Sequence, residues 1–272
     1  MPIDFSSPGN RNTYALRVAD PTWTQGITAL IDPRGLRVAD IGCGGGIYST
    51  SWLELGAESV VGVDFSAQMI EDAVTRADES PDLTFLLADA TATGLVDHSA
   101  DLVFQRALVH HLEEPVLAYR EAKRILAPTG RLMIQDRTMT DVRRPGSPTH
   151  LRGYFFELYP HLLDFEAARR PKEQQVEADL LSAGFSNAER HTLAERRRTY
   201  ASIDELSDDL RARTGRSILH ELTTSELERL IDYISAKVDA EKPIEEIDYW
   251  TVWLAAPPRQ FFDANDSAVL GR

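Results

Sequence analysis

Cysteine is almost absent from this sequence, because Cys43 is the only one among 272 residues. A single thiol cannot form an intramolecular disulfide, so we expect a chain that folds in a reducing, cytoplasmic setting. The same count excludes zinc sites built from several cysteines. The stretch after residue 137 also lacks paired ligands at helical spacing, such as H-x-x-x-H. We therefore expect no metal.

Basic residues and long apolar runs are scarce as well. Lys and Arg total 29 against 43 Asp and Glu, which gives a net charge of −14. A nucleic-acid binder needs a basic face, so no nucleic-acid partner is expected. No run approaches the ~18 apolar residues that a membrane span needs, and the first residues lack a signal-peptide pattern, so we expect no membrane insertion. Apolar residues still make up 43% of the chain, enough for a sizeable core.

Residues 36–137 alternate short apolar runs with amphipathic stretches. "LRVADI", "SVVGVD", "LTFLLAD", "ADLVFQR" and "RLMIQDR" indicate strands, whereas "IYSTSWLELGA", "SAQMIEDAVTRADE" and "EPVLAYREAKRIL" indicate helices. A turn is expected at "APTG", and Ser66 is a good N-cap. Such alternation predicts an α/β fold whose mostly parallel sheet has helices on both faces.

The alternation stops after residue 137, where Pro and aromatic residues gather. We expect helices at about 172–183, 203–214 and 224–241, a strand in "NAERHTLAERRRTYA", and a last, antiparallel strand in "IDYWTVWLAA". Lid segments would be residues 139–173 and 203–241, over a core at 36–137. This predicts a single domain over residues 1–256, with a loosely attached tail at 257–272.

The stretch "LRVADIGCGGGIYST" places glycines at Gly42, Gly44, Gly45 and Gly46, directly after an expected strand. Glycines at such a place let the backbone turn sharply and approach a ligand, and the following helix presents free N–H groups. The dinucleotide fingerprint G-x-G-x-x-G would require a third glycine where Ile47 stands. The spacing therefore disfavours a NAD site.

Three acids end three successive expected strands, namely Asp40, Asp64 and Asp89. The carboxyl ends of parallel strands are where ligands bind in open sheets. A carboxylate at Asp64 can accept hydrogen bonds from both hydroxyls of a ribose, and Asp89 is placed for an exocyclic amine. The combination of glycine loop and ordered acids predicts a nucleoside-containing ligand.

The motifs "VADIGCGGG", "VVGVDFSAQMI", "LLADATA" and "DLVFQRALVHHLEEPVLAYREAKRILAPTGRLMI" resemble those of class I S-adenosylmethionine-dependent methyltransferases. The similar subgroup is the small-molecule one, methyltransferase type 11, which includes ubiquinone- and menaquinone-biosynthesis enzymes. The resemblance covers about residues 36–137. It implies a Rossmann-like seven-stranded sheet, a helical lid and S-adenosyl-L-methionine as cofactor.

By that resemblance the glycine loop would hold the methionine part of the cofactor. Gly42, Gly44 and Gly46 would admit it, Cys43 would offer its N–H, and Asp40 would hold the amino group.

The nucleoside would lie against the ends of the next two strands. Asp64 would bind the ribose, Phe65 and Met69 would flank the adenine, and Asp89 with Ala90 would bind its edge.

The remaining implied residues surround the transferred methyl group. Gln105 and Arg106 would border it, and Tyr14 would close over the cofactor. His110 or His111 is a candidate general base, because the pKa of histidine is near neutrality. The alternative is that both histidines have only a structural role and pack the loop.

Aromatic residues of the first lid segment would line an apolar substrate pocket or simply pack the lid; the candidates are Tyr154, Phe155 and Tyr159. The function implied is methyl transfer to an O, N or C nucleophile of a small, partly apolar molecule. Two alternatives stay open. One is a protein that binds the cofactor without methylating, as a sensor or another kind of catalyst, and the other is a NAD-dependent oxidoreductase.

Overall fold

The computed structural model describes residues 19–77, 80–186, 188–213 and 215–258. Within these residues the strands are β1 (Arg37–Ile41), β2 (Ser59–Asp64), β3 (Leu83–Leu87), β4 (Ala100–Arg106), β5 (Leu126–Asp136), β6 (Glu189–Tyr200) and β7 (Ile244–Ala255). They form one seven-stranded sheet in the order β3-β2-β1-β4-β5-β7-β6. The pairs among β1 to β5 are parallel, and β7 is antiparallel to both of its neighbours. The expected sheet, with its antiparallel last strand, is confirmed.

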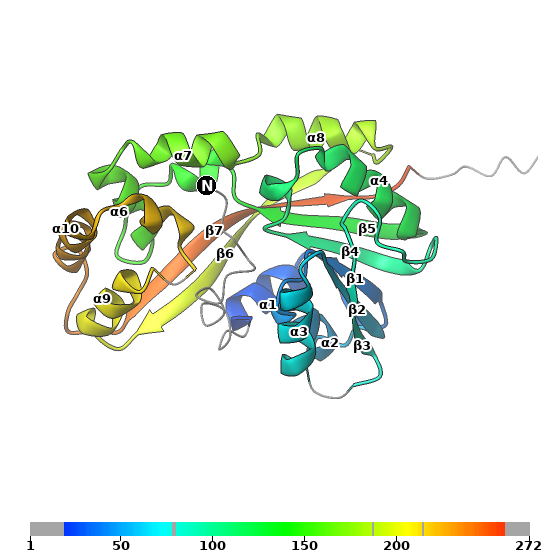
Figure 1. Ribbon diagram of the computed structural model, residues 1–272, viewed down its shortest axis with the longest axis horizontal. Coiled ribbons are helices and arrows are strands. Elements are labelled where there is room, and N and C mark those ends of the chain that lie inside the picture. Colours follow the sequence, from blue (N-terminus) through cyan, green and yellow to red (C-terminus); the bar gives the residue numbers. More distant parts are fainter. Residues whose placement is uncertain (1–18, 78–79, 187, 214, 259–272) are drawn as a thin grey trace, which may run out of the picture.

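Helices cover both faces of this sheet. Those of the core are α1 (Pro21–Thr28), α2 (Ile47–Glu54), α3 (Ala67–Arg76), α4 (Pro115–Ile125) and α8 (Glu173–Ser182). Helices α1 to α3 lie on one side, and α4 and α8 lie on the other (Figure 1). The hydroxyl of Ser66 caps α3 by accepting a hydrogen bond from the Met69 amide, as expected.

Large apolar side chains fill both interfaces between helices and sheet. On the α1–α3 side, the rings of Trp23, Trp52 and Phe104 are fully buried and meet at centroid distances of 5.3 to 6.0 Å. On the α4–α8 side, Tyr119 and Trp253 belong to a second buried cluster. Because both faces are covered, a ligand can reach this sheet only at the ends of its strands.

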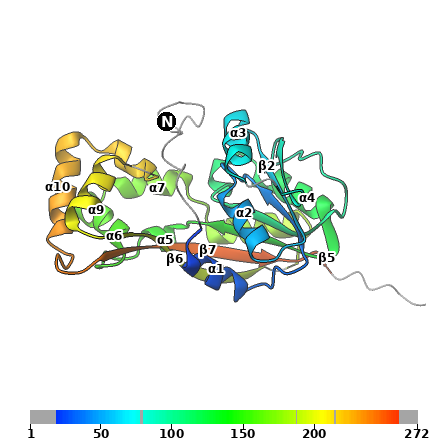
Figure 2. The ribbon, with the colours of Figure 1, turned by 90° about the horizontal axis from the view of Figure 1, so that it is seen from below.

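The lid is a group of helices with an apolar cluster of its own. Its elements are α5 (Met139–Val142), α6 (Leu151–Leu158), α7 (Leu162–Arg169), α9 (Ile203–Arg211), the 3₁₀ turn η3 (Ser217–Glu221) and α10 (Thr224–Ser235). Phe155, Leu219 and Leu230 are fully buried in it. β6 and β7, of 12 residues each, run from the core into the lid, so the two parts share this strand pair (Figure 2).

Three local expectations need correction. The turn expected at "APTG" is an irregular part of β5, because the β4–β5 register jumps from Ala100↔Leu126 to Leu102↔Arg131. The helix expected over 203–214 ends at Arg211, before a left-handed residue at Arg213. The helix expected over 224–241 ends at Ser235, and the Asp239 carboxylate then accepts a hydrogen bond from the Glu241 amide in a local turn.

Helix α1 is absent from the sequence-based expectations. Its signal is present, because Asp20 caps the helix by accepting from the Thr22 amide and Pro21 occupies its first turn.

Some expectations fall outside the described residues, namely those for Tyr14 and for the tail from residue 259 onward. The single-domain boundary stays a prediction. No helix in the described ranges combines the length and apolar character that crossing a membrane requires.

We predict that Gly62→Ala lowers the free energy of unfolding by about 1–3 kcal/mol. A Cβ at Gly62 in β2 would lie 2.6 Å from the Phe85 ring and 3.0 Å from the Cys43 sulfur, so the core must shift. Gly45→Ala is the matched control, because its Cβ would meet nothing closer than 3.7 Å. Urea unfolding measures both. Equal stability of the two variants would contradict the prediction.

Candidate active site at the ends of beta1, beta2, beta4 and beta5

The sheet reverses its strand order between β1 and β4. The chain leaves β1 toward β2 and leaves β4 toward β5, so the connections diverge and open a crevice at this point. Ile41 and Gln105 are paired at the carboxyl ends of the two strands. The glycine loop follows β1 directly, and the expected cofactor residues therefore gather at a place where α/β sheets bind ligands.

The glycine loop has a backbone that needs glycine. Gly42, Gly44 and Gly46 adopt φ values of 76°, 53° and 76°, in the left-handed region. A Cβ at Gly44 would meet no atom within 4 Å, whereas one at Gly46 would meet the Phe85 ring at 2.9 Å. Gly44 thus borders open space that a ligand can enter, and Gly46 permits close packing at the start of α2. The expectation of a bare backbone facing a ligand fits this geometry.

Asp64 organises the loop from the end of β2. One carboxylate oxygen accepts a hydrogen bond from the Gly44 amide at 2.9 Å, and the other accepts from the Ser66 amide at 2.9 Å. Each oxygen keeps lone pairs for further donors. The carboxylate is therefore oriented and still able to accept bonds from two ligand hydroxyls.

Asp40 lies deeper, at the end of β1. Its carboxyl is 2% exposed and accepts a hydrogen bond of 2.6 Å from the Ser49 hydroxyl of α2. Burial, with a smaller contribution from the charge of Asp64, raises the pKa of Asp40 to about 7. Among the described residues Asp40 forms no salt bridge. Ser49 is a contact that the sequence reading missed.

Gln105, in β4, is the clearest unsatisfied polar group at this edge. Its side chain is 1% exposed, yet neither its amide nitrogen nor its amide oxygen has a partner among the described residues. An unpaired buried amide costs free energy, so a polar ligand at the end of β4 would stabilise it.

The expected adenine contacts lie at a more open part of the edge. Phe65 is 69% exposed, Met69 and Ala90 are half-buried, and Asp89 is exposed. Hydrogen bonds from the hydroxyl and the amide of Thr91 lower the pKa of Asp89 and hold it ionised. An exposed aromatic ring beside Asp64 is suited to stack on a planar base.

Arg106 is more constrained than its sequence suggests. Its guanidinium lies 4.0 Å from the ring centroid of Tyr48 and 4.3 Å from that of Trp250, and it donates a 2.7 Å hydrogen bond to Glu195. Burial lowers the pKa of Arg106, but the negative charges around it, led by that of Glu195, together outweigh burial and raise it. Glu195 and Trp250 lie on β6 and β7, so Arg106 ties the cofactor edge to the strands that carry the lid.

His110 forms a pair with an acid that the sequence reading passed over. Its Nδ1 lies 2.9 Å from both carboxylate oxygens of Asp136, the last residue of β5. Burial alone would raise the pKa of Asp136, but His110 and Arg170 beside it lower it, so Asp136 is a carboxylate. A carboxylate only accepts, which places the proton on Nδ1 and leaves Nε2 as the basic nitrogen. The ring centroid of His111 lies 4.0 Å from that of His110.

The sequence contains a signal that could have identified Asp136 as a site residue, namely its position as an acid at the end of an expected strand. Asp136 ends "RLMIQD" as Asp64 ends its strand, while Asp40 lies one residue before the end of β1 and Asp89 follows β3.

The lid aromatics are engaged in packing. Phe155 is fully buried, Tyr154 is 5% exposed, and the Tyr159 hydroxyl donates to the Glu226 carbonyl at 3.0 Å. All three belong to or pack against the lid cluster. This placement favours the packing interpretation, and a substrate contact for them stays a prediction.

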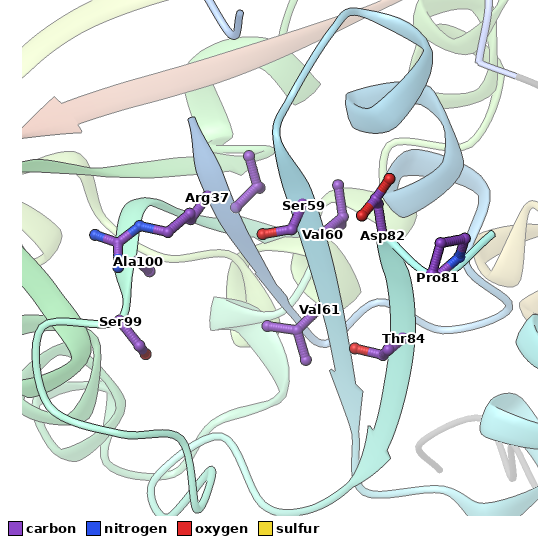
Figure 3. A pocket seen from close by; sticks show the side chains of 10 residues that line it. Arg37, Ser59, Val60, Val61, Pro81, Asp82, Thr84, Ser99 and Ala100 are labelled. Atoms are coloured by element: carbon purple, nitrogen blue, oxygen red, sulfur yellow. The ribbon is translucent and has the colours of Figure 1, made fainter. Parts of the chain in front are cut away.

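Hollows in the described structure include two that lie away from the glycine loop. One, of about 110 Å³, lies at the starts of the strands, beside Arg37, Ser59 and Ala100, on the edge opposite the site (Figure 3). The other, of about 660 Å³, lies beside His110 and is bordered by α4, by the end of α7 and by α8. Its lining mixes acids and bases, so its charge selects no ligand class. In the described part of the chain, no group of three or more His, Cys, Asp or Glu side chains is arranged to hold a metal ion.

Residues 39–134 match the family model described as a methyltransferase domain. Ubiquinone biosynthesis O-methyltransferase of Cereibacter sphaeroides is 39% identical over 110 residues, which make up 40% of this chain and 43% of that protein. The core of this chain is a class I S-adenosylmethionine-dependent methyltransferase domain. The chain spans less than half of that relative's length, and the lid lies outside the matched family region.

Solved structures share the fold of this methyltransferase domain together with its lid. Phosphoethanolamine N-methyltransferase 2 of Haemonchus contortus, solved with phosphomonomethylethanolamine and S-adenosylhomocysteine, has a TM-score of 0.54 at 20% identity, covering 87% of this chain and 53% of that chain. The cyclase SpnF has a TM-score of 0.55 at 18% identity, covering 87% of this chain and 80% of that chain. These likenesses show the fold alone.

The raised pKa of Asp40 makes stability depend on pH. Because the folded pKa of about 7 lies above the unfolded value, the folded state binds the extra proton, and stability falls as pH rises from about 4 to 7. We predict that the stability of Asp40→Asn relative to wild type increases by roughly 2–3 kcal/mol between pH 5 and pH 8. Urea unfolding of the ligand-free protein measures this.

The control for this prediction is Asp32→Asn. It removes an exposed carboxylate that Arg34 holds at a pKa of about 2, so its effect stays constant between pH 5 and pH 8. A constant effect of Asp40→Asn as well would contradict the buried, unpaired state of Asp40.

Proposed function

We propose that this protein transfers the methyl group of S-adenosylmethionine to an O, N or C nucleophile of a small, partly apolar molecule. The observation that carries the proposal is the buried carboxyl of Asp40, beside the glycine loop of a methyltransferase-family core, which forms no salt bridge with any described residue. The ammonium and sulfonium groups of this cofactor supply positive charge. A phosphate-bearing dinucleotide would bring negative charge to the same place.

The residues around the crevice fit each part of this cofactor. Asp40 would hold the ammonium group, and the unpartnered amide of Gln105 would bond the methionine part. Asp64, oriented by two backbone amides, would accept from the ribose hydroxyls. The exposed ring of Phe65 would cover the adenine. When bound, the cofactor supplies an electrophilic methyl group for in-line displacement by the acceptor.

The chain's own contribution to the reaction would be alignment and proton removal. Asp136 fixes the imidazole of His110, so that Nε2 can take a proton from the acceptor as its nucleophile attacks. Arg170 lies 3.6 Å from Asp136 and helps to keep it ionised. Alignment of the acceptor and exclusion of water by the lid would supply several kcal/mol of the acceleration.

A second candidate is a catalyst that uses this fold without methyl transfer. The fold likeness to the cyclase SpnF is the observation in its favour. The two candidates differ in one product, because only methyl transfer releases S-adenosylhomocysteine.

We predict that the wild-type protein binds S-adenosylmethionine and S-adenosylhomocysteine in titration calorimetry but does not bind NAD. Asp64→Ala should weaken binding at least about tenfold, because the ribose loses a charged acceptor. Asp82→Ala is the control, since this exposed acid lies at the opposite edge of the sheet. Binding of NAD alone would refute the assignment of the cofactor, and tight binding by Asp64→Ala would refute the ribose contact.

We predict that His110→Ala lowers kcat by roughly 10²–10⁴-fold, because the base is lost. Binding of S-adenosylhomocysteine should not change. The assay follows methyl-labelled S-adenosylmethionine with a panel of phenols, catechols and amines. Asp136→Asn should also lower kcat, and His220→Ala, an exposed lid histidine, is the control. An unchanged kcat in His110→Ala would refute the role of His110 as general base and leave it a packing role.

A further inference from the structure

Three arginines lie in the segment that follows β5, at the base of the lid. They are Arg137, Arg144 and Arg152, which we call the lid-base arginines. The side chain of Arg152, on α6, is 8% exposed, and that of Arg137 is 13% exposed. Arg144 is half-buried. In a protein of net charge −14, buried cations at one place need a specific reason.

These arginines are incompletely paired. The guanidinium carbon of Arg144 lies 4.3 Å from the ring centroid of Tyr249. The Arg144 side chain has no hydrogen bond or ion pair to any described residue. Arg137 donates to Asp248 at 2.5 Å, and Arg152 donates to Glu166 at 2.8 Å. The Nε of each of the three is buried and has no acceptor in the described structure. Each guanidinium group carries five N–H donors, so most of the donors of these three arginines have no acceptor among the described residues.

The single negative charge of Glu166 is shared among three arginines, because Arg169 and Arg170 pair with the same carboxylate as Arg152. Burial, to which the positive charges of Arg137 and Arg170 add, lowers the pKa of Arg152 to about 9. Glu166 and Asp248 oppose this shift but do not offset burial, so the charge of Arg152 is only partly compensated by its neighbours. An anion at this place would compensate it further.

The lid-base arginines are connected to the proposed active site on two sides. The guanidinium of Arg137 lies 3.9 Å from the ring centroid of Trp250, and the guanidinium of Arg106 contacts the same ring. The indole N–H of Trp250 is itself a buried donor without a partner among the described residues. On the other side, Arg170 reaches both Asp136 and Glu166, so that it links His110 to Arg152.

We propose that the lid-base arginines bind an anionic group, a carboxylate or a phosphate, of the acceptor. This inference rests on the proposed function, because it assigns the acceptor's charge at the same site. The unpartnered side-chain atoms identified here, on the three arginines and Trp250, are all donors, which matches a ligand whose oxygens only accept. Planar guanidinium groups bind carboxylate and phosphate in two-point fashion. The acceptor would then present its nucleophile to His110 while the anion anchors it under the lid.

The test titrates benzoate and inorganic phosphate into the protein saturated with S-adenosylhomocysteine, with benzamide as the neutral counterpart of benzoate. We expect one of the anions to bind and benzamide to bind at least about tenfold more weakly. Arg144→Met should weaken anion binding at least about tenfold, and it breaks no ion pair with a described residue. Arg137→Met should do the same.

Arg211→Met is the matched control, because it removes an exposed lid arginine on α9 that pairs with Glu228. Thermal unfolding checks that each variant is folded. Absence of anion binding, or equal losses in Arg144→Met and Arg211→Met, would overturn the inference. Weaker binding of S-adenosylhomocysteine by Arg144→Met would also overturn it, since the arginines would then serve the cofactor's own carboxylate.

The inference and the proposed function fail in different ways. Absence of S-adenosylhomocysteine binding refutes the proposed cofactor, and the anion titration then runs on the free protein. Binding of S-adenosylhomocysteine without anion binding leaves methyl transfer in place and refutes only the anionic acceptor.

Discussion

The ligand edge depends on a carboxyl group, that of Asp40, which folding buries without a salt bridge to any described residue. Its place at the end of β1 follows from the parallel sheet, in which strand ends at the switch point must face the crevice. The Ser49 hydroxyl is its only hydrogen-bond partner among the described residues. The folded protein therefore carries an unfavourable charge at neutral pH, which a cationic ligand relieves. Part of the fold's stability is thus linked to ligand binding.

The same principle, with opposite sign, operates at the lid base. There the buried charges are arginines, and acids from β7 and α7 neutralise them only in part. The long β6–β7 pair brings the two regions together, because its strands supply Glu195 to Arg106 and Trp250 to both Arg106 and Arg137. The protein thereby places a negative pocket for the proposed cofactor next to a positive region for the proposed acceptor.

Between these regions lies the pair of His110 and Asp136. His110, which follows β4, lies 2.9 Å from Asp136, the last residue of the neighbouring β5, and Arg170, which follows α7 of the lid, lies 3.6 Å from Asp136. Arg170 therefore adds to the effect of His110 in keeping Asp136 ionised.

The sequence by itself determined the α/β core and led to the prediction of the cofactor-binding edge, because both depend on local signals. Apolar runs of strand length, the glycines that permit φ values near 76°, and acids at strand ends are each visible within a few residues. The same rule, that an acid at a strand end marks a ligand site, could also have identified Asp136. Only the tertiary structure decided which distant side chains meet: Ser49 with Asp40, Asp136 with His110, and Trp250 with two arginines. It also placed Phe155 in the lid's own core. Such contacts follow from strand order and from the path of the lid, which the local pattern of a sequence does not encode.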